Sequence, residues 1–225
     1  YAPWRDQKFL DQFGGRKEMI SFCQQNNLPI TATHEQPYST DANLLGLTHE
    51  AGRLESLKTP ADFITPGMGC HPENAPDQVE HFTIAFKQGI PTEINSNKVT
   101  PLTAIEQANR IGGRNAVGIG THVVENRFVG IKSRGVYESP GMELIGKCYE
   151  YLLQLILDRR ARRVFDQAST QIAEQVYEGY WFAPVTQSLL ESIKPFTKLA
   201  SGQITVSLYK GNITFHSATE SPHSL

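Results

Sequence analysis

Apolar residues recur at intervals of three and four in several segments of the chain, which is the spacing of one face of a helix. Thr100-Pro101 predicts a helix start, because a hydroxyl residue caps and a proline opens many helices, and Gly112-Gly113 predicts its end. Asp158 has the same capping character before a second strong pattern. Helices are expected over residues 15–26, 100–113, 140–156, 158–179 and 185–194.

Other segments alternate between apolar and polar residues, as half-buried strands do. Two such pairs are separated by turn residues and predict hairpins. They are residues 82–86 with 91–94 around Gly89, and residues 204–209 with 212–217 around Lys210-Gly211.

The remaining segments have weaker patterns. Residues 43–48 form an apolar run that predicts a short strand, and residues 117–131 are rich in β-forming side chains. Residues 56–78 are rich in Pro and Gly and predict a long loop. Strands and helices do not alternate in a βαβ rhythm. We therefore expect an α+β fold, with a mixed or antiparallel sheet, packed helices and two α+β subdomains, and not a Rossmann or P-loop fold.

Composition limits the function classes. The 225 residues are 39% hydrophobic and 20% charged, as in ordinary globular proteins, and the net charge is −2. That charge gives no support to nucleic-acid binding, and no apolar stretch is long enough to predict a membrane span. The opening residues 1–5 contain neither Met nor an apolar signal region, which suggests a fragment of a longer protein.

The three cysteines lie far apart and form no metal-binding spacing. They are Cys23, Cys70 and Cys148. Cys70 adjoins His71, but adjacent residues are badly placed to chelate, so no metal site is expected. Unpaired thiols favour a reducing compartment, and we expect the cytoplasm, with a plastid as the alternative in a plant or alga because transit peptides are removed.

Charged residues interrupt the apolar segment at 125–127 and again at 132–135. Buried charges need a partner or a ligand, so two interpretations stay open. The cluster is either a hairpin with solvated turn residues, or a polar pocket for a zwitterionic or anionic ligand.

Two further polar segments also have two interpretations. The segment Pro37–Asp41 has the composition of an ordinary turn, yet hydroxyls at Ser39 and Thr48 could bind a carboxylate or an amide. The arginines of the run 159–163 indicate a solvated helix start or a subunit contact, with nucleic-acid binding as the alternative. By themselves these residues support an α+β domain with a small-molecule pocket.

Several segments together resemble the argininosuccinate synthase family, in order and approximate spacing over essentially the whole chain. The run 124–140 is the specific one. The matching segments are Ala2-Pro3-Trp4-Arg5, Pro37-Tyr38-Ser39-Thr40-Asp41-Ala42-Asn43-Leu44, Glu50-Ala51-Gly52, Val124-Glu125-Asn126-Arg127-Phe128, the run from Gly130 to Pro140, and Val206-Ser207-Leu208-Tyr209-Lys210-Gly211.

The resemblance implies a ligase that joins citrulline to aspartate with conversion of ATP to AMP and pyrophosphate. It places citrulline contacts on Ser39, Thr48, Glu125 and Tyr137, with Glu125 suited to the α-ammonium group. Thr48 departs from the family pattern, where Ser is usual. Lys132 and Arg134 match the motif, and the resemblance leaves a phosphate-facing or a structural role open for them.

The family's ATP loop, a Ser-Gly-Gly-Leu-Asp-Thr-Ser motif, is absent from these 225 residues. The resemblance therefore implies that residues 1–225 are the C-terminal synthetase and oligomerisation domain. ATP with Mg²⁺, and aspartate, would bind mainly to an N-terminal half, and a C-terminal arm would help to form a homotetramer. The alternative is a non-catalytic binding or assembly module derived from the same family.

Overall fold

A computed structural model describes residues 1–30, 38–126 and 130–224 of the chain. The chain divides into two compact units, in agreement with the two subdomains expected from the sequence. The first comprises Tyr1–Ala42, Thr48–Ile64 and His122–Val136, and the second comprises Asn43–Leu47, Thr65–Thr121 and Tyr137–Leu225.

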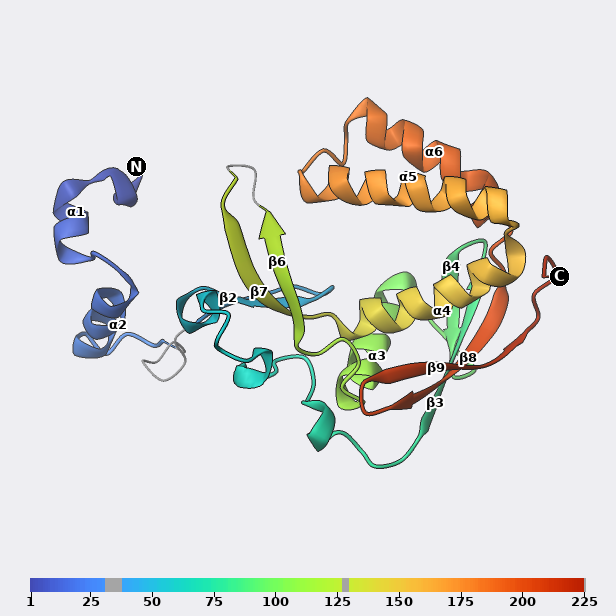
Figure 1. Cartoon of the computed structure of the whole chain (residues 1–225), viewed down its shortest axis with the longest axis horizontal. Coiled ribbons are helices and arrows are strands. Elements are labelled where there is room, and N and C mark those ends of the chain that lie inside the picture. Colours follow the sequence, from blue (N-terminus) through green and yellow to red (C-terminus); the bar gives the residue numbers. More distant parts are fainter. Residues whose placement is uncertain (31–37, 127–129, 225) are drawn as a thin grey trace. The chain divides into compact units, whose positions relative to one another are not determined.

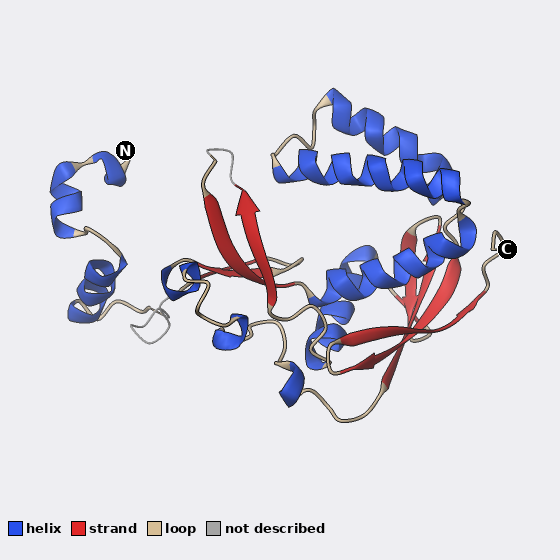
Figure 2. Cartoon of the chain, viewed as in Figure 1, coloured by secondary structure: helices blue, strands red, loops and turns tan. Residues whose placement is uncertain are grey.

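Helices and strands are mixed along the chain, so the predicted α+β class is confirmed (Figures 1 and 2). The α-helices are α1 (Gln7–Gln12), α2 (Arg16–Gln25), α3 (Pro101–Arg114), α4 (Pro140–Ile156), α5 (Arg159–Tyr177) and α6 (Pro184–Thr197). The strands are β1 (Ser39–Ala42), β2 (Leu47–Glu50), β3 (Glu80–Lys87), β4 (Ile90–Ile94), β5 (Asn97–Lys98), β6 (Thr121–Asn126), β7 (Lys132–Glu138), β8 (Gly202–Tyr209) and β9 (Asn212–Thr219). Short 3₁₀ helices lie at Pro3–Arg5, Gly52–Glu55, Ala61–Phe63 and Pro72–Asn74.

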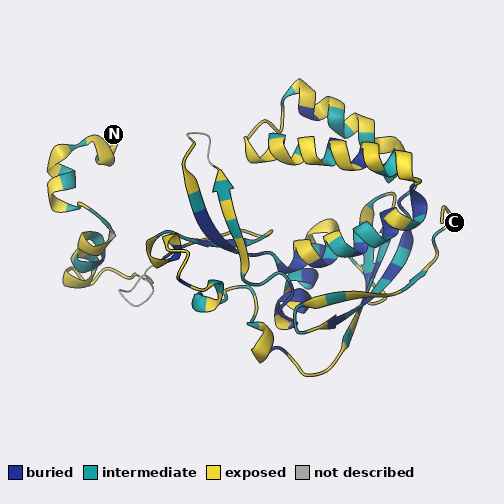
Figure 3. Cartoon of the chain, in the orientation of Figure 1, coloured by how far each residue is buried: buried dark blue, intermediate teal, exposed yellow. Residues whose placement is uncertain are grey.

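The second unit is built on an antiparallel sheet with the strand order β5-β4-β3-β8-β9. Helices α3 and α4 lie along one face of this sheet (Figure 1). Buried positions recur along the strands of this sheet (Figure 3). The buried side chains of the two central strands include Phe82, Ile84, Val206 and Leu208, none of which exposes any surface. The predicted alternation therefore produces the core of this unit.

Helices α5 and α6 form an antiparallel pair in the same unit (Figure 2). The predicted cap is confirmed, because the Asp158 carboxylate accepts hydrogen bonds from the amides of Arg160 and Ala161. Arg162 forms an ion pair with Asp166 one turn along, at 2.7 Å, which fits the solvated helix start expected for the arginine run. None of the helices that the structure describes is both long and apolar enough to cross a membrane.

The first unit contains the four-stranded sheet of order β1-β2-β7-β6 and the N-terminal helices. Its buried cluster consists of Tyr38, Leu54, Ile64 and Val136. Ahead of the sheet, rings along the N-terminal segment pack in sequence, Trp4 on Phe9, Phe9 on Phe13 and Phe13 on Phe22, with centroids 4.9–5.4 Å apart. Such tilted and edge-to-face ring pairs join α1 to α2.

Two local predictions are wrong. Residues 43–46 are the turn between β1 and β2, not part of a strand, and the amide of Asn43 donates to the carbonyl of Gly46. The segment assigned to a turn, from Ser39 to Asp41, is instead strand β1, while Pro37 lies outside the described residues. Polar residues in a short edge strand carry the same signal as a turn, which explains the second error, and the leucines of residues 43–46 gave this turn the apolar character of a strand, which explains the first.

The glycine pair Gly112-Gly113 does not end helix α3 but lies within its last turn, and the helix continues to Arg114. The reason is close packing. A Cβ at position 112 would lie 2.8 Å from the carbonyl oxygen of Pro140, and one at position 113 would overlap the carbonyl oxygen of Met68. Only hydrogen fits where the backbones of α3, α4 and the long loop meet.

We therefore expect Gly113→Ala to lower the free energy of unfolding by about 1–3 kcal/mol or more, because the added methyl overlaps main-chain atoms. Gly146→Ala is the matched control. Gly146 also lies inside a helix, but a Cβ added there would have nothing within 4 Å. That change should raise stability by about 0.5–1 kcal/mol. Urea unfolding of both variants measures the difference, and equal effects at the two positions would contradict this account.

Candidate functional site

The four predicted citrulline contacts lie on four different strands. Ser39 is on β1, Thr48 on β2, Glu125 on β6 and Tyr137 on β7, and each side chain is half-buried. In the strand order, β1 and β2 are neighbours, while β6 is at the opposite edge of the sheet. Tyr137 begins the last segment of the second unit, directly after Val136 in strand β7.

Ser39 and Thr48 lie on the same face of the sheet. On the other face, the Thr40 hydroxyl is 3.0 Å from Nδ1 of the buried His49, whose ring packs edge-on against Tyr38. Because successive side chains point to opposite faces, the neighbours of Thr40 and His49 point the other way. The structure thus brings these two hydroxyl side chains to one surface from adjacent strands.

Strand β7 shows the same division. Arg134 and Val136 are buried, and Val136 packs with Tyr38, so Ser133 lies on the face that carries Ser39 and Thr48. Glu125 is half-buried between exposed neighbours on β6. Strands are about 4.8 Å apart, so β6 is about 10 Å from β2 across the sheet. Arg127 lies outside the described residues.

Strand β7 ends at Glu138, a buried carboxyl group that the sequence analysis did not single out. Glu138 exposes no surface, and its two oxygens accept hydrogen bonds of 2.7–3.1 Å from the amides of Gly67 and Met68. The same loop meets Gly113 of α3 at the close contact described above. Glu138 therefore fixes the centre of the long loop to the end of β7.

Comparison with known proteins is decisive on the family. Residues 38–225 match the family model described as "Arginosuccinate synthase C-terminal domain". This chain belongs to the argininosuccinate synthase family. The argininosuccinate synthase of Rhodopirellula baltica is 44% identical over 225 residues, those of Thermotoga sp. and Danio rerio are 36% and 35% identical over 229 residues, and all of this chain is covered in each case. The chain spans about half the length of these relatives, between 55% and 56%.

The two cations of the argininosuccinate synthase motif on β7 have different surroundings. Lys132 is exposed. Arg134 is only 6% exposed, and its Nη1 donates to the carbonyls of Leu54 and Ser56 at 3.0 and 2.9 Å. Its Nε has no hydrogen-bond partner among the described residues. Arg134 therefore ties the 3₁₀ segment at Gly52–Glu55 and the residue after it to the sheet, which is a structural contact.

Two titratable groups away from the site have shifted pKa values. The Arg114 guanidinium holds the pKa of the Glu80 carboxyl below its ordinary value, and the Asn115 amide, 2.7 Å from Glu80 Oε2, acts in the same direction. Burial raises the pKa of the Cys148 thiol to about 12, so this thiol is protonated and inert at neutral pH. In the described part of the chain, no three His, Cys, Asp or Glu side chains gather as a metal site.

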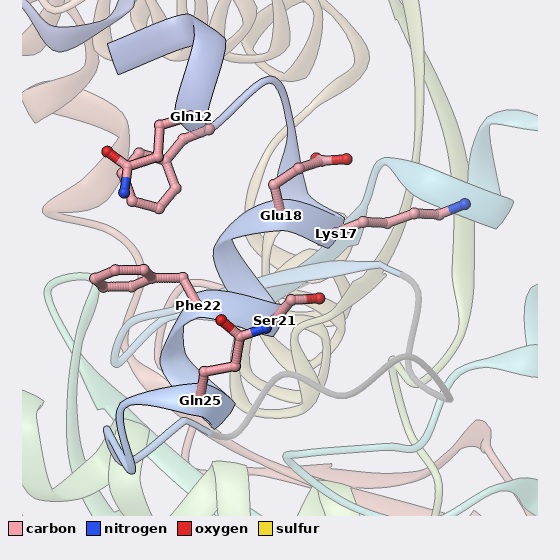
Figure 4. A pocket seen from close by; sticks show the side chains of 7 residues that line it. Gln12, Lys17, Glu18, Ser21, Phe22 and Gln25 are labelled. Atoms are coloured by element: carbon pink, nitrogen blue, oxygen red, sulfur yellow. The ribbon is translucent and has the colours of Figure 1, made fainter. Parts of the chain in front are cut away.

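A separate hollow lies between α1 and α2, and none of its lining residues is a predicted citrulline contact. It has a volume of about 340 Å³ and is lined by Gln12, Phe13, Lys17, Glu18, Ser21, Phe22 and Gln25. Phe22 and Lys17 extend to opposite sides of α2 (Figure 4). The hollow is open and lined largely by exposed side chains, so it gives no indication of a specific ligand.

The different surroundings of Lys132 and Arg134 on β7 allow a direct test of the structural role of Arg134. Arg134→Met should lower the free energy of unfolding by about 1–3 kcal/mol, because two carbonyls lose their donor. Lys132→Met, which removes an exposed cation from the same strand, should change it by less than about 0.5 kcal/mol. Thermal or urea unfolding compares the two. If both variants had the same free energy of unfolding, the hydrogen bonds from Arg134 to the carbonyls would make no contribution to stability.

Proposed function

We propose that this chain is the citrulline-binding half of an ATP-dependent, AMP-forming ligase that condenses citrulline with aspartate to argininosuccinate. The observation that supports the proposal most directly is the arrangement of Ser39 and Thr48. These hydroxyls come from neighbouring strands, share one face of the sheet and coincide with the residues that the family resemblance assigns to citrulline.

In this proposal Glu125 binds the α-ammonium group of citrulline. A charge-assisted hydrogen bond at that point discriminates an amino acid from a simple amide. The hydroxyls of Ser39, Thr48 and Tyr137 accept or donate further hydrogen bonds to the same molecule. An extended amino acid lying across the strands reaches from the β1–β2 side toward β6, which accounts for contacts so far apart in sequence.

The chemical step needs more than this chain. The ureido oxygen of citrulline attacks the α-phosphate of ATP and releases pyrophosphate, and the amine of aspartate then displaces AMP from the adenylate. Holding the ureido group in line with the phosphate supplies much of the acceleration for such a transfer. We propose that ATP with Mg²⁺, and aspartate, bind mainly outside these 225 residues, and that the complete cytoplasmic enzyme is a homotetramer.

Glu125→Gln in a full-length enzyme carrying this sequence should raise the KM for citrulline about tenfold or more, because a charged hydrogen bond is worth about 1.5–3 kcal/mol. The KM for ATP should change much less. Tyr137→Phe should have a smaller effect, since it removes a neutral hydroxyl. Glu174→Gln, which removes an exposed charge on α5, is the control and should leave both constants unchanged. Unchanged citrulline kinetics in Glu125→Gln would exclude this residue from the site.

The 225-residue chain by itself should form no AMP from ATP, citrulline and aspartate, because no phosphate-binding loop is present in its sequence. Chromatographic detection of AMP and pyrophosphate tests this, with the full-length enzyme as the positive control. AMP production that depends on both amino acids would overturn the proposal that ATP and aspartate bind mainly outside these 225 residues. A chain that still binds citrulline without turnover would support it.

A further inference from the structure

The five-stranded sheet of the second unit has one face covered by helices and one polar face. On β3 and β8, Phe82, Val206 and Leu208 are buried toward the helices. Their neighbours therefore point away from the helices, and these include His81 and Ser207, which are paired across the two strands. The polar face thus carries an imidazole and a hydroxyl side by side.

A bulge in β9 brings a second histidine to the same face. Thr205 pairs with Ser217 and Val206 pairs with Phe215, so His216 is an extra residue between them. Phe215 packs against Tyr151 of α4, with ring centroids 5.2 Å apart, which puts Phe215 on the helix side. His216 consequently points to the polar face. Bulges commonly re-aim a side chain in this way.

The imidazole rings of His81 and His216 lie against each other. Their centroids are 4.6 Å apart with the ring planes at 49°, and both side chains are exposed. The Ser207 hydroxyl lies 3.2 Å from Nδ1 of His81. A partner on Nδ1 fixes the ring orientation and leaves Nε2 to ligate, which is the usual arrangement of a metal-binding histidine.

The spacing fits a single ion. With metal–nitrogen bonds of about 2.1 Å and bond angles of about 90–105°, two imidazoles bound to one ion have centroids about 4.6–5.2 Å apart. Imidazole nitrogen suits zinc, copper and nickel, whereas magnesium and calcium prefer oxygen ligands. From this geometry we propose that His81 and His216 form a surface site for a divalent transition-metal ion. Because no cluster of three ligand side chains occurs among the described residues, water completes the coordination.

Titration of the 225-residue chain with Zn²⁺, followed by the imidazole nitrogen signals in NMR spectra, tests the site. We expect saturable shifts of the His81 and His216 nitrogens. His81→Gln and His216→Gln should each weaken binding at this site about tenfold or more, because a second tethered ligand acts at high effective concentration. Signals of both rings that stay unmoved, or single variants that bind as tightly as the parent, would overturn the proposal.

His122→Gln is the matched control, because His122 is an exposed histidine on a different sheet. Its affinity for Zn²⁺ at the proposed site should equal that of the parent, and an equal loss in this variant would mean non-specific binding. Circular dichroism of each variant confirms that the fold is retained. The result is independent of citrulline or ATP, so it does not bear on the ligase proposal.

Discussion

A carboxyl group with no exposed surface is costly unless its oxygens are hydrogen-bonded, and Glu138 meets that requirement with two consecutive main-chain amides. Those amides belong to a loop seventy residues earlier in the sequence. The carboxyl thus determines where the loop lies, and the loop in turn occupies the space that Gly113 leaves open on α3. The positions of Glu138, the loop and α3 are therefore set together within the second unit.

The parts of the fold that could be predicted are those with a local period. Alternation in β3 and β8 and the caps at Thr100 and Asp158 each act within a few residues, and each matches the structure. The glycine pair in α3 is misread from sequence because a helix end and a close contact require the same residue. The partners Met68 and Pro140 distinguish the two, and both are remote in sequence.

The candidate site shows the same limit. Family resemblance could nominate Ser39 and Thr48, but their common face depends on strand pairing, which the bond between Thr40 and His49 reveals. Nor does sequence separate Lys132 from Arg134, two cations two residues apart. Alternation predicts the same face for both, yet among the described residues Arg134 alone of the two donates to main-chain carbonyls. The meeting of His81 and His216 depends on one extra residue in β9, which no periodic pattern contains.

Segments without regular structure are usually where a protein accepts inserted residues. The connection from Ile64 to Glu80 is irregular, apart from one short 3₁₀ turn, but it is not uniform (Figure 2). At Gly67 to Gly69 the connection is held by hydrogen bonds to the Glu138 carboxylate, and its backbone packs directly against the backbone of Gly113. An inserted residue should therefore be tolerated in the exposed stretch around Glu73 and Asn74, and should disturb the fold if it is placed between Gly67 and Gly69.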